Sequence, residues 1–150
     1  MAELVRAVTL REGRAAYFAK NGWDEKGYDV RWVRIQAGPI PLFIYNTAGR
    51  KKAVKLHDLH HVLTGYETSW TGEAEIGGWE LASGCGWHFM AWYLNGWAFL
   101  IGLFIAPRRA LRAFRKGLRE GNLYGETLTD ALLDSDADAV RARLGIERLT

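Results

Sequence analysis

The sequence predicts a mainly α-helical protein, a helical bundle with a short β-hairpin or extended segment near residues 30–45. Two segments carry helix start and stop signals at their ends, and a third has no charged residue over positions 81–106 before Pro107. A chain of 150 residues has the size of one domain and is long enough to bury a core. We therefore expect a single helical domain over residues 1–150.

The N-terminal third is predicted to form a helix followed by a hairpin. Thr9 and Glu12 have the spacing of a capping box, and Asn21-Gly22 is a helix stop. Strand-forming residues fill positions 30–36 and 40–45, with a turn between them. Pro41 confines the second strand to a sheet edge, because proline cannot donate a backbone hydrogen bond. An extended lid laid over the helices is the alternative.

A second helix is predicted between Thr47, a good N-cap residue, and Gly65, a good C-terminal stop. At about 100° per residue, His61 lies about 40° from His57 and falls between His57 and Asp58. These three side chains therefore project from one side of the helix. Two imidazoles at positions i and i+4 with a carboxylate beside them can bind a divalent metal ion from a single helix.

A further ligand must come from another element, and Glu73 is the candidate. A helix that begins near Thr71 would place Glu73 and Glu80 on one face. Glu80 is expected either to orient a ligating histidine or to act as a catalytic proton acceptor. His60 points about 60° away from His57 on the opposite side, so we do not expect it to bind the metal. Mixed imidazole and carboxylate ligands suit zinc best, with iron or manganese as alternatives. The simpler interpretation is a set of ordinary surface and core histidines.

These residues form the motif His57-Asp58-x-x-His61, followed after eleven residues by Glu73. The motif resembles the metal-site motif of the ubiquinone (coenzyme Q) biosynthesis protein 4 family. The resemblance extends over roughly residues 47–82 and is loose in the rest of the chain. It implies that all four residues bind the metal.

The resemblance implies a ubiquinone-biosynthesis-like protein that binds a divalent metal and a polyprenyl lipid. As a metal-dependent lyase or oxygenase, it would act in decarboxylation or hydroxylation of a polyprenyl hydroxybenzoate, the prenylated aromatic ring. The implied partners are a polyprenyl lipid or quinone precursor, the membrane surface and other biosynthetic enzymes, and a homodimer is left open. The alternative is a non-catalytic, membrane-associated, lipid-binding scaffold for a biosynthetic complex. A metal-dependent hydrolase ranks last, because His88 is the only distant histidine.

Residues 81–106 are long enough to span a bilayer core of about 30 Å, and an arginine-rich helix follows Pro107. We prefer a helix that is buried in the bundle, lining an apolar tunnel or seating the protein on the membrane, because glycines and His88 interrupt the run. A transmembrane helix over residues 85–106 is the minority interpretation. The expected location is cytoplasmic, peripheral to the inner face of the membrane.

The composition excludes several classes of protein. The net charge of +3 and a pI near 9.1 are too mild for a nucleic-acid-binding protein. Cys85 is the only cysteine, which excludes an internal disulfide framework. The first residues lack the apolar core of a signal peptide. The basic residues at 50–55 are expected to be solvated, with a phosphate or anionic-lipid contact as the alternative.

Overall fold

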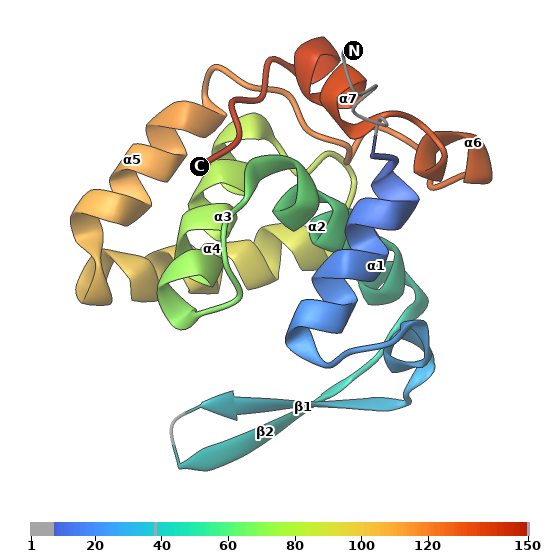
Figure 1. The fold of residues 1–150 in the computed structure, drawn as a ribbon. Helices are drawn as coiled ribbons and strands as arrows, with labels where there is room; N and C mark the ends of the chain where they lie inside the picture. The colour runs from blue at the N-terminus through green and yellow to red at the C-terminus, as the bar shows by residue number, and fades with distance from the viewer. Residues whose placement is uncertain (1–7, 38, 150) are drawn as a thin grey trace.

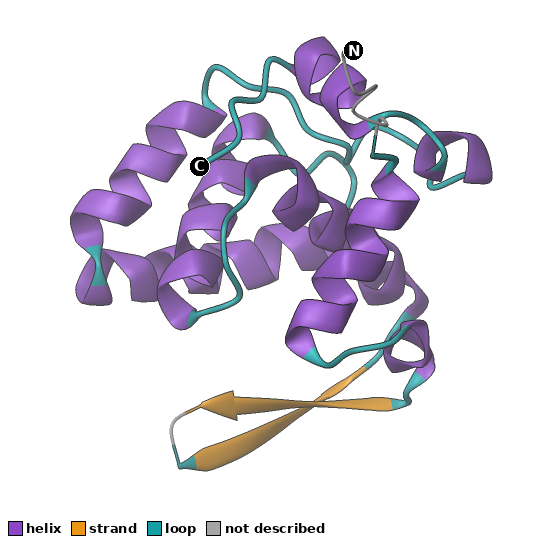
Figure 2. Ribbon diagram, in the orientation of Figure 1, coloured by secondary structure: helices purple, strands orange, loops and turns teal. Residues whose placement is uncertain are grey.

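The computed structural model describes residues 8–37 and 39–149. The first seven residues, for which the sequence predicts no signal peptide, and Gly38 of the predicted turn lie outside the described residues. The described part is mainly helical with one small antiparallel sheet (Figures 1 and 2). The elements are α1 (Leu10–Asn21), η1 (Glu25–Asp29), β1 (Trp32–Ala37), β2 (Ile40–Tyr45), α2 (Ala48–Thr64), α3 (Trp70–Ser83), α4 (Phe89–Ile105), α5 (Pro107–Gly117), α6 (Asp130–Leu133) and α7 (Ala137–Leu144).

The predicted mainly α-helical fold is confirmed, and the first two helices begin and end at the expected signals. Thr9 forms a capping box with Glu12, and α1 stops at Gly22, whose φ of 68° is left-handed. At the start of α2, the Thr47 side chain accepts a hydrogen bond from the backbone N–H of Arg50. The helix stops at Gly65, which has a φ of 81°.

The predicted hairpin is also confirmed. Strands β1 and β2 pair antiparallel, with Trp32 opposite Tyr45 and Ile35 opposite Leu42. The hairpin projects from the helical body (Figure 1), so it is not the extended lid that the sequence left as an alternative. Its base is held by the buried Asn46, whose side-chain N–H groups donate to the carbonyls of Tyr28 and Val30, each at 2.8 Å.

Helix α3 packs against both α4 and α5. The contacts are close because glycines face the neighbouring helices. A Cβ on Gly102 of α4 would lie 2.5 Å from the Cβ of Ala74. A Cβ on Gly117 of α5 would lie 2.3 Å from the carbonyl oxygen of Trp79. Any side chain at these two positions would push the helices apart, so the glycines fix the position of α3 and with it Glu73 and Glu80.

The uncharged run at 81–106 is divided between two helices. Helix α3 continues to Ser83, and Gly84 and Gly86, with φ of 94° and 53°, form the turn before α4. Among the described residues, the structure has no helix of the length and apolarity needed to cross a membrane. We expected a helix in the uncharged run to be buried in the bundle. In α4 only one strip is buried, formed by Ala91, Asn95 and Gly102. Most of its aromatic side chains are exposed, for example Trp97 (53%) and Phe104 (82%).

Candidate metal centre

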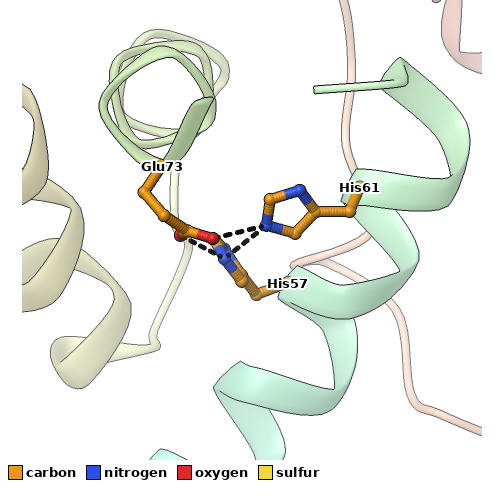
Figure 3. A group of neighbouring side chains, drawn as sticks. All are labelled: His57, His61 and Glu73. Carbon is orange, nitrogen blue, oxygen red and sulfur yellow. Dashed lines mark hydrogen bonds and ion pairs between the residues drawn. The ribbon is translucent and has the colours of Figure 1, made fainter. Parts of the chain in front are cut away.

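Three side chains from two helices converge on one point. His57 and His61 extend from α2 toward Glu73 on α3 (Figure 3). The two Nε2 atoms lie 3.1 Å apart. Glu73 places one carboxylate oxygen 3.3 Å from Nε2 of His57 and the other 3.2 Å from Nε2 of His61. One ligand atom from each residue lies within 4.8 Å of the others, so this cluster can hold a metal ion.

The other nitrogen of each ring is held by an acceptor. Nδ1 of His61 lies 2.8 Å from the backbone carbonyl of Tyr66, and Nδ1 of His57 lies 2.9 Å from a carboxylate oxygen of Glu80. A carbonyl and a carboxylate only accept hydrogen bonds, so each Nδ1 carries the proton. Each Nε2 in a neutral ring then presents a lone pair toward the other Nε2 and toward Glu73. Three electron-rich groups that face one another repel unless a proton or a metal ion lies among them.

The electrostatics of the cluster agree with this geometry. Burial opposes the charged form of Glu73, but hydrogen bonds from His57 and His61 outweigh it and lower the pKa of the carboxyl group to about 2. Burial also works against a charged His57, yet Glu80 and Glu73 raise the pKa of this histidine well above 6.5. The side chain of His61 is fully buried, whereas Glu73 is 35% exposed. The cluster therefore has a buried side and a side that opens to solvent.

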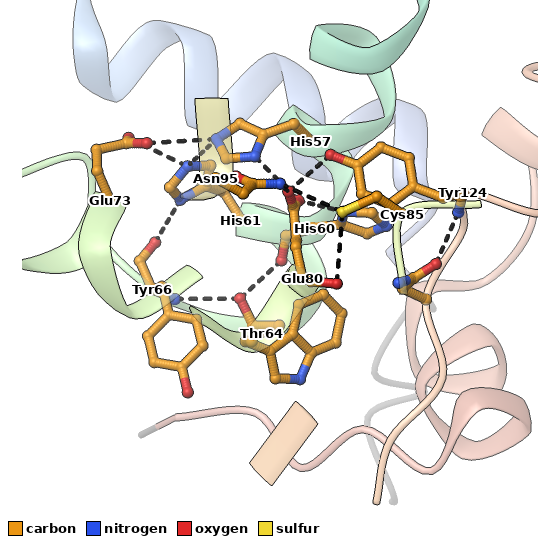
Figure 4. A network of polar contacts seen from close by, with 12 residues as sticks. His57, His60, His61, Thr64, Tyr66, Glu73, Glu80, Cys85, Asn95 and Tyr124 are labelled. Carbon is orange, nitrogen blue, oxygen red and sulfur yellow. Dashed lines mark hydrogen bonds and ion pairs between the residues drawn. The ribbon is translucent and has the colours of Figure 1, made fainter. Parts of the chain in front are cut away.

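Glu80 lies behind the cluster at the centre of a buried network (Figure 4). One of its oxygens accepts from Nδ1 of His57 and from Nδ1 of His60, at 2.9 and 2.5 Å. The other accepts from the Tyr124 hydroxyl at 2.6 Å and from the Asn95 side-chain amide. Burial alone would raise the pKa of Glu80, but the two histidines hold it well below its ordinary value. The hydrogen bond to Glu80 thus fixes the ring of His57. The two roles expected for Glu80, orienting a ligating histidine or accepting a catalytic proton, stay predictions.

His60 belongs to this network and lies outside the three-residue cluster. Its Nε2 accepts a hydrogen bond of 2.9 Å from the backbone N–H of Leu123, while its Nδ1 donates to Glu80. Its side chain is fully buried. Burial is the main cause that lowers the pKa of His60, so the ring is neutral at pH 7. His60 therefore connects α2 to the segment after α5 and supports the cluster from behind.

Asp58 lies apart from the three converging side chains. Its carboxylate accepts a hydrogen bond of 2.5 Å from the Tyr28 hydroxyl of η1, and it also interacts with Tyr17 of α1. Desolvation raises the pKa of Asp58 and is only partly offset by His57 and Tyr28. Tyr17 also stacks on the ring of His61, with centroids 5.2 Å apart. In this arrangement Asp58 holds the tyrosines beside the site, and it is not part of the cluster that can hold a metal ion.

We expect Asp58→Asn to keep the metal, with affinity lowered by about ten- to a hundredfold, because the residue acts through its neighbours. His61→Ala should instead lose the metal. Isothermal titration of both purified variants with zinc checks the difference. If Asp58→Asn binds no metal while remaining folded, Asp58 is itself a ligand.

Comparisons with known proteins find no match to the chain among family models, curated proteins or solved structures. The structure itself shows a helical fold in which His57, His61 and Glu73 form a cluster that can hold a metal ion. Three contributors to the site had no signal in the motif, namely the Tyr66 carbonyl, Asn95 and Tyr124. Asn95 could have been suspected, because it is an isolated amide in an uncharged run.

Proposed function

We propose that this protein is a metal-dependent enzyme of ubiquinone synthesis, which binds a divalent metal through His57, His61 and Glu73. Its substrate is a polyprenylated hydroxybenzoate, whose ring loses its carboxyl group or gains a hydroxyl group. The observation that carries the proposal is the convergence of two Nε2 atoms and one carboxylate, with both Nδ1 atoms fixed by acceptors. Three protein ligands leave a coordination position for substrate or water, as in catalytic rather than structural sites.

The metal's identity is linked to the reaction. A bound divalent cation supplies positive charge for a substrate carboxylate or acidifies a water molecule. Replacing the ring carboxyl group by a hydroxyl group also removes two electrons from the ring, so that reaction requires an oxidant such as dioxygen. Zinc, which the ligand set favours, serves decarboxylation alone, whereas iron or manganese serves the oxidative reaction.

The surroundings of the cluster support a substrate with an aromatic ring and a charged group. A pocket of about 630 Å³ reaches His61, and Tyr17 and Tyr66 line it together with charged side chains that include Lys20, Arg141 and Arg148. The exposed aromatic side chains of α4 offer an apolar surface for a prenyl chain, and they precede the arginine-rich α5. We propose that this part of the surface lies against the membrane, peripheral to its inner face, where such substrates and the partner enzymes of the pathway are found.

The alternative is a non-catalytic lipid-binding scaffold, in which the metal only stabilises the fold. The exposed apolar face of α4 is compatible with this function, since such a face binds a lipid without any chemistry. The partly exposed Glu73 favours the enzyme, because a purely structural metal site is closed to solvent by four protein ligands.

Metal analysis and turnover test the proposal. We expect about one metal equivalent in the purified protein and none in Glu73→Gln or His61→Ala. His88→Ala is the matched control, because His88 bonds to the Tyr124 carbonyl at 3.1 Å and lies outside the cluster. The loaded protein should then convert a prenylated hydroxybenzoate, followed by mass spectrometry. If the protein binds metal but shows no turnover with zinc, iron or manganese, the scaffold is the remaining function. If it binds no metal after reconstitution, the metal-dependent enzyme is refuted and only a membrane-associated lipid binder remains.

A further inference from the structure

A second cavity, of about 660 Å³, lies apart from the metal centre. Its walls come from α1, η1, α2, α6 and the two residues before α6, and α1 contacts both α2 and α6 (Figure 1). None of His57, His61 and Glu73 lines it. The cavity has the volume of a small-molecule site, and the proposed enzyme reaction does not use it.

The charged side chains of the wall are not all paired with one another. Two lysines, Lys26 and Lys55, line the cavity and have no carboxylate partner among the described residues. Arg11 is held by Asp134 as well as by an acid of the wall, so it offers a ligand no free charge. Each acid of the wall is already paired with a cation of the protein, namely Glu25 with Arg14, Asp130 with Arg11 and Asp29 with Lys51. Two ammonium groups are therefore available to an anion.

Arg14 gives the cavity a buried hydrogen-bond donor. Its side chain is only 6% exposed, and it is paired with Glu25, whose side chain is 68% exposed. A guanidinium has several N–H groups, and Glu25 accepts from only one of the terminal nitrogens. Among the described residues, the only buried side-chain nitrogen or oxygen without a partner is Nε of Arg50, so the free N–H groups of Arg14 are not enclosed in the core. Because Arg14 lines the cavity, these groups can donate to a ligand there.

Tyr28 brings Lys55 and Arg14 to the same part of the wall. The ammonium group of Lys55 lies 5.2 Å from the centre of the Tyr28 ring. Burial raises the pKa of Tyr28, and the charge of Arg14 opposes this effect, so the guanidinium also lies near the phenol. Tyr28 is buried and held by its hydrogen bond of 2.5 Å to Asp58. The wall is therefore formed before any ligand binds.

From these observations we propose that this cavity binds a phosphate group, either as free phosphate or as the head of a small organic phosphate. A phosphate monoester carries about two negative charges at pH 7, which match the two lysines, and its oxygens can accept from the free N–H groups of Arg14. A monocarboxylate would leave one lysine without a counter-charge. Leu128 and Leu133 also line the cavity and leave an apolar place for an organic group. The site does not depend on the metal centre.

Lys55 connects this site to the sequence. It is one of the basic residues at 50–55, for which a phosphate contact was the alternative to a solvated helix face. Of the basic residues in that segment, only Lys55 lines the cavity. Lys52, on the same helix, is exposed and lies outside the lining, so it provides a matched control.

Titration of the purified full chain with inorganic phosphate and with phenyl phosphate tests the site. Lys26→Gln and Lys55→Gln should each weaken binding about tenfold, because each removes one of the two available charges. Lys52→Gln should change the affinity less than about twofold. Tighter binding of phenyl phosphate would identify an organic phosphate, and equal binding of the two probes would identify free phosphate. Equal weakening by Lys52→Gln and Lys55→Gln, or no binding of either probe by the wild type, would overturn the proposal.

Two further variants separate this site from loss of folding and from the metal centre. Glu25→Gln should strengthen phosphate binding about two- to fivefold, because the acid that competes for Arg14 loses its charge. A gain in affinity cannot result from partial unfolding, and its absence would contradict the role of Arg14. His61→Ala should bind phosphate as the wild type does, since His61 lies outside the cavity. Phosphate binding that is lost in His61→Ala would place the anion at the metal centre and overturn this site.

Discussion

Replacing Glu80 by alanine is expected to lower the free energy of unfolding by about 3–5 kcal/mol. The carboxylate accepts from four donors: His57, His60, Asn95 and Tyr124. Alanine would leave all four donors without an acceptor in a fully buried site, and each unsatisfied group costs about 1–3 kcal/mol before the structure relaxes. The measurement is the midpoint and slope of urea denaturation, followed by circular dichroism.

The matched control is Glu67→Ala. Glu67 is exposed, and its ion pair with Lys20 spans 4.0 Å, so its loss should change stability by less than about 1 kcal/mol. Equal destabilisation by the two variants would contradict the central position of Glu80. Glu80→Ala should also lose metal affinity, because His57 would no longer have an acceptor that fixes its Nδ1 proton.

Much of the fold was predictable because its signals are local. The capping box at Thr9 and the glycine at position 65 mark helix ends through groups only a few residues away. The hairpin was predictable for the same reason, since strand-forming residues flank a short turn. The extent of burial was not predictable in this way. Residues 81–106 are uncharged in sequence, but two positive-φ glycines divide them and α4 is largely exposed.

The sequence predicted the relative positions of cluster residues that lie on the same helix, but not their contacts with other elements. The spacing of His57 and His61 fixes their common face, and the position of Glu73 in the next helix brings it opposite. The same angular argument places Asp58 beside His57, but it cannot show that Tyr28 from another element takes the carboxylate. Tyr124 lies 44 residues after Glu80, and no local pattern connects the two.

The second large effect is stabilisation of the fold by the metal. A ligand that binds only the folded state stabilises it by about 2.7 kcal/mol when its free concentration is about 100 times Kd. The unfolded chain does not hold the three ligand atoms together, so added zinc should raise the unfolding free energy of the wild type by this amount. In His61→Ala, added zinc should not raise the unfolding free energy. Thermal denaturation with and without zinc measures both.

His60→Ala separates the metal from the network behind it. This variant removes a donor to Glu80 and leaves the Leu123 N–H without its acceptor, so it should be about 2–4 kcal/mol less stable than the wild type without metal. The stabilising increment from zinc should nevertheless persist, because His60 is not one of the converging ligands. If His60→Ala abolished the increment while His61→Ala retained it, the metal would lie on the other side of α2.

The increase in unfolding free energy caused by zinc should also depend on pH in a defined direction. Glu80 and Glu73 raise the pKa of His57 well above 6.5, so at neutral pH this ring carries a proton that the metal must displace from Nε2. Stabilisation by zinc should therefore grow as the pH rises toward that pKa and shrink in acid. The proton and the metal compete for the same place between His57, His61 and Glu73. A zinc increment that did not change with pH would show that the metal binds elsewhere.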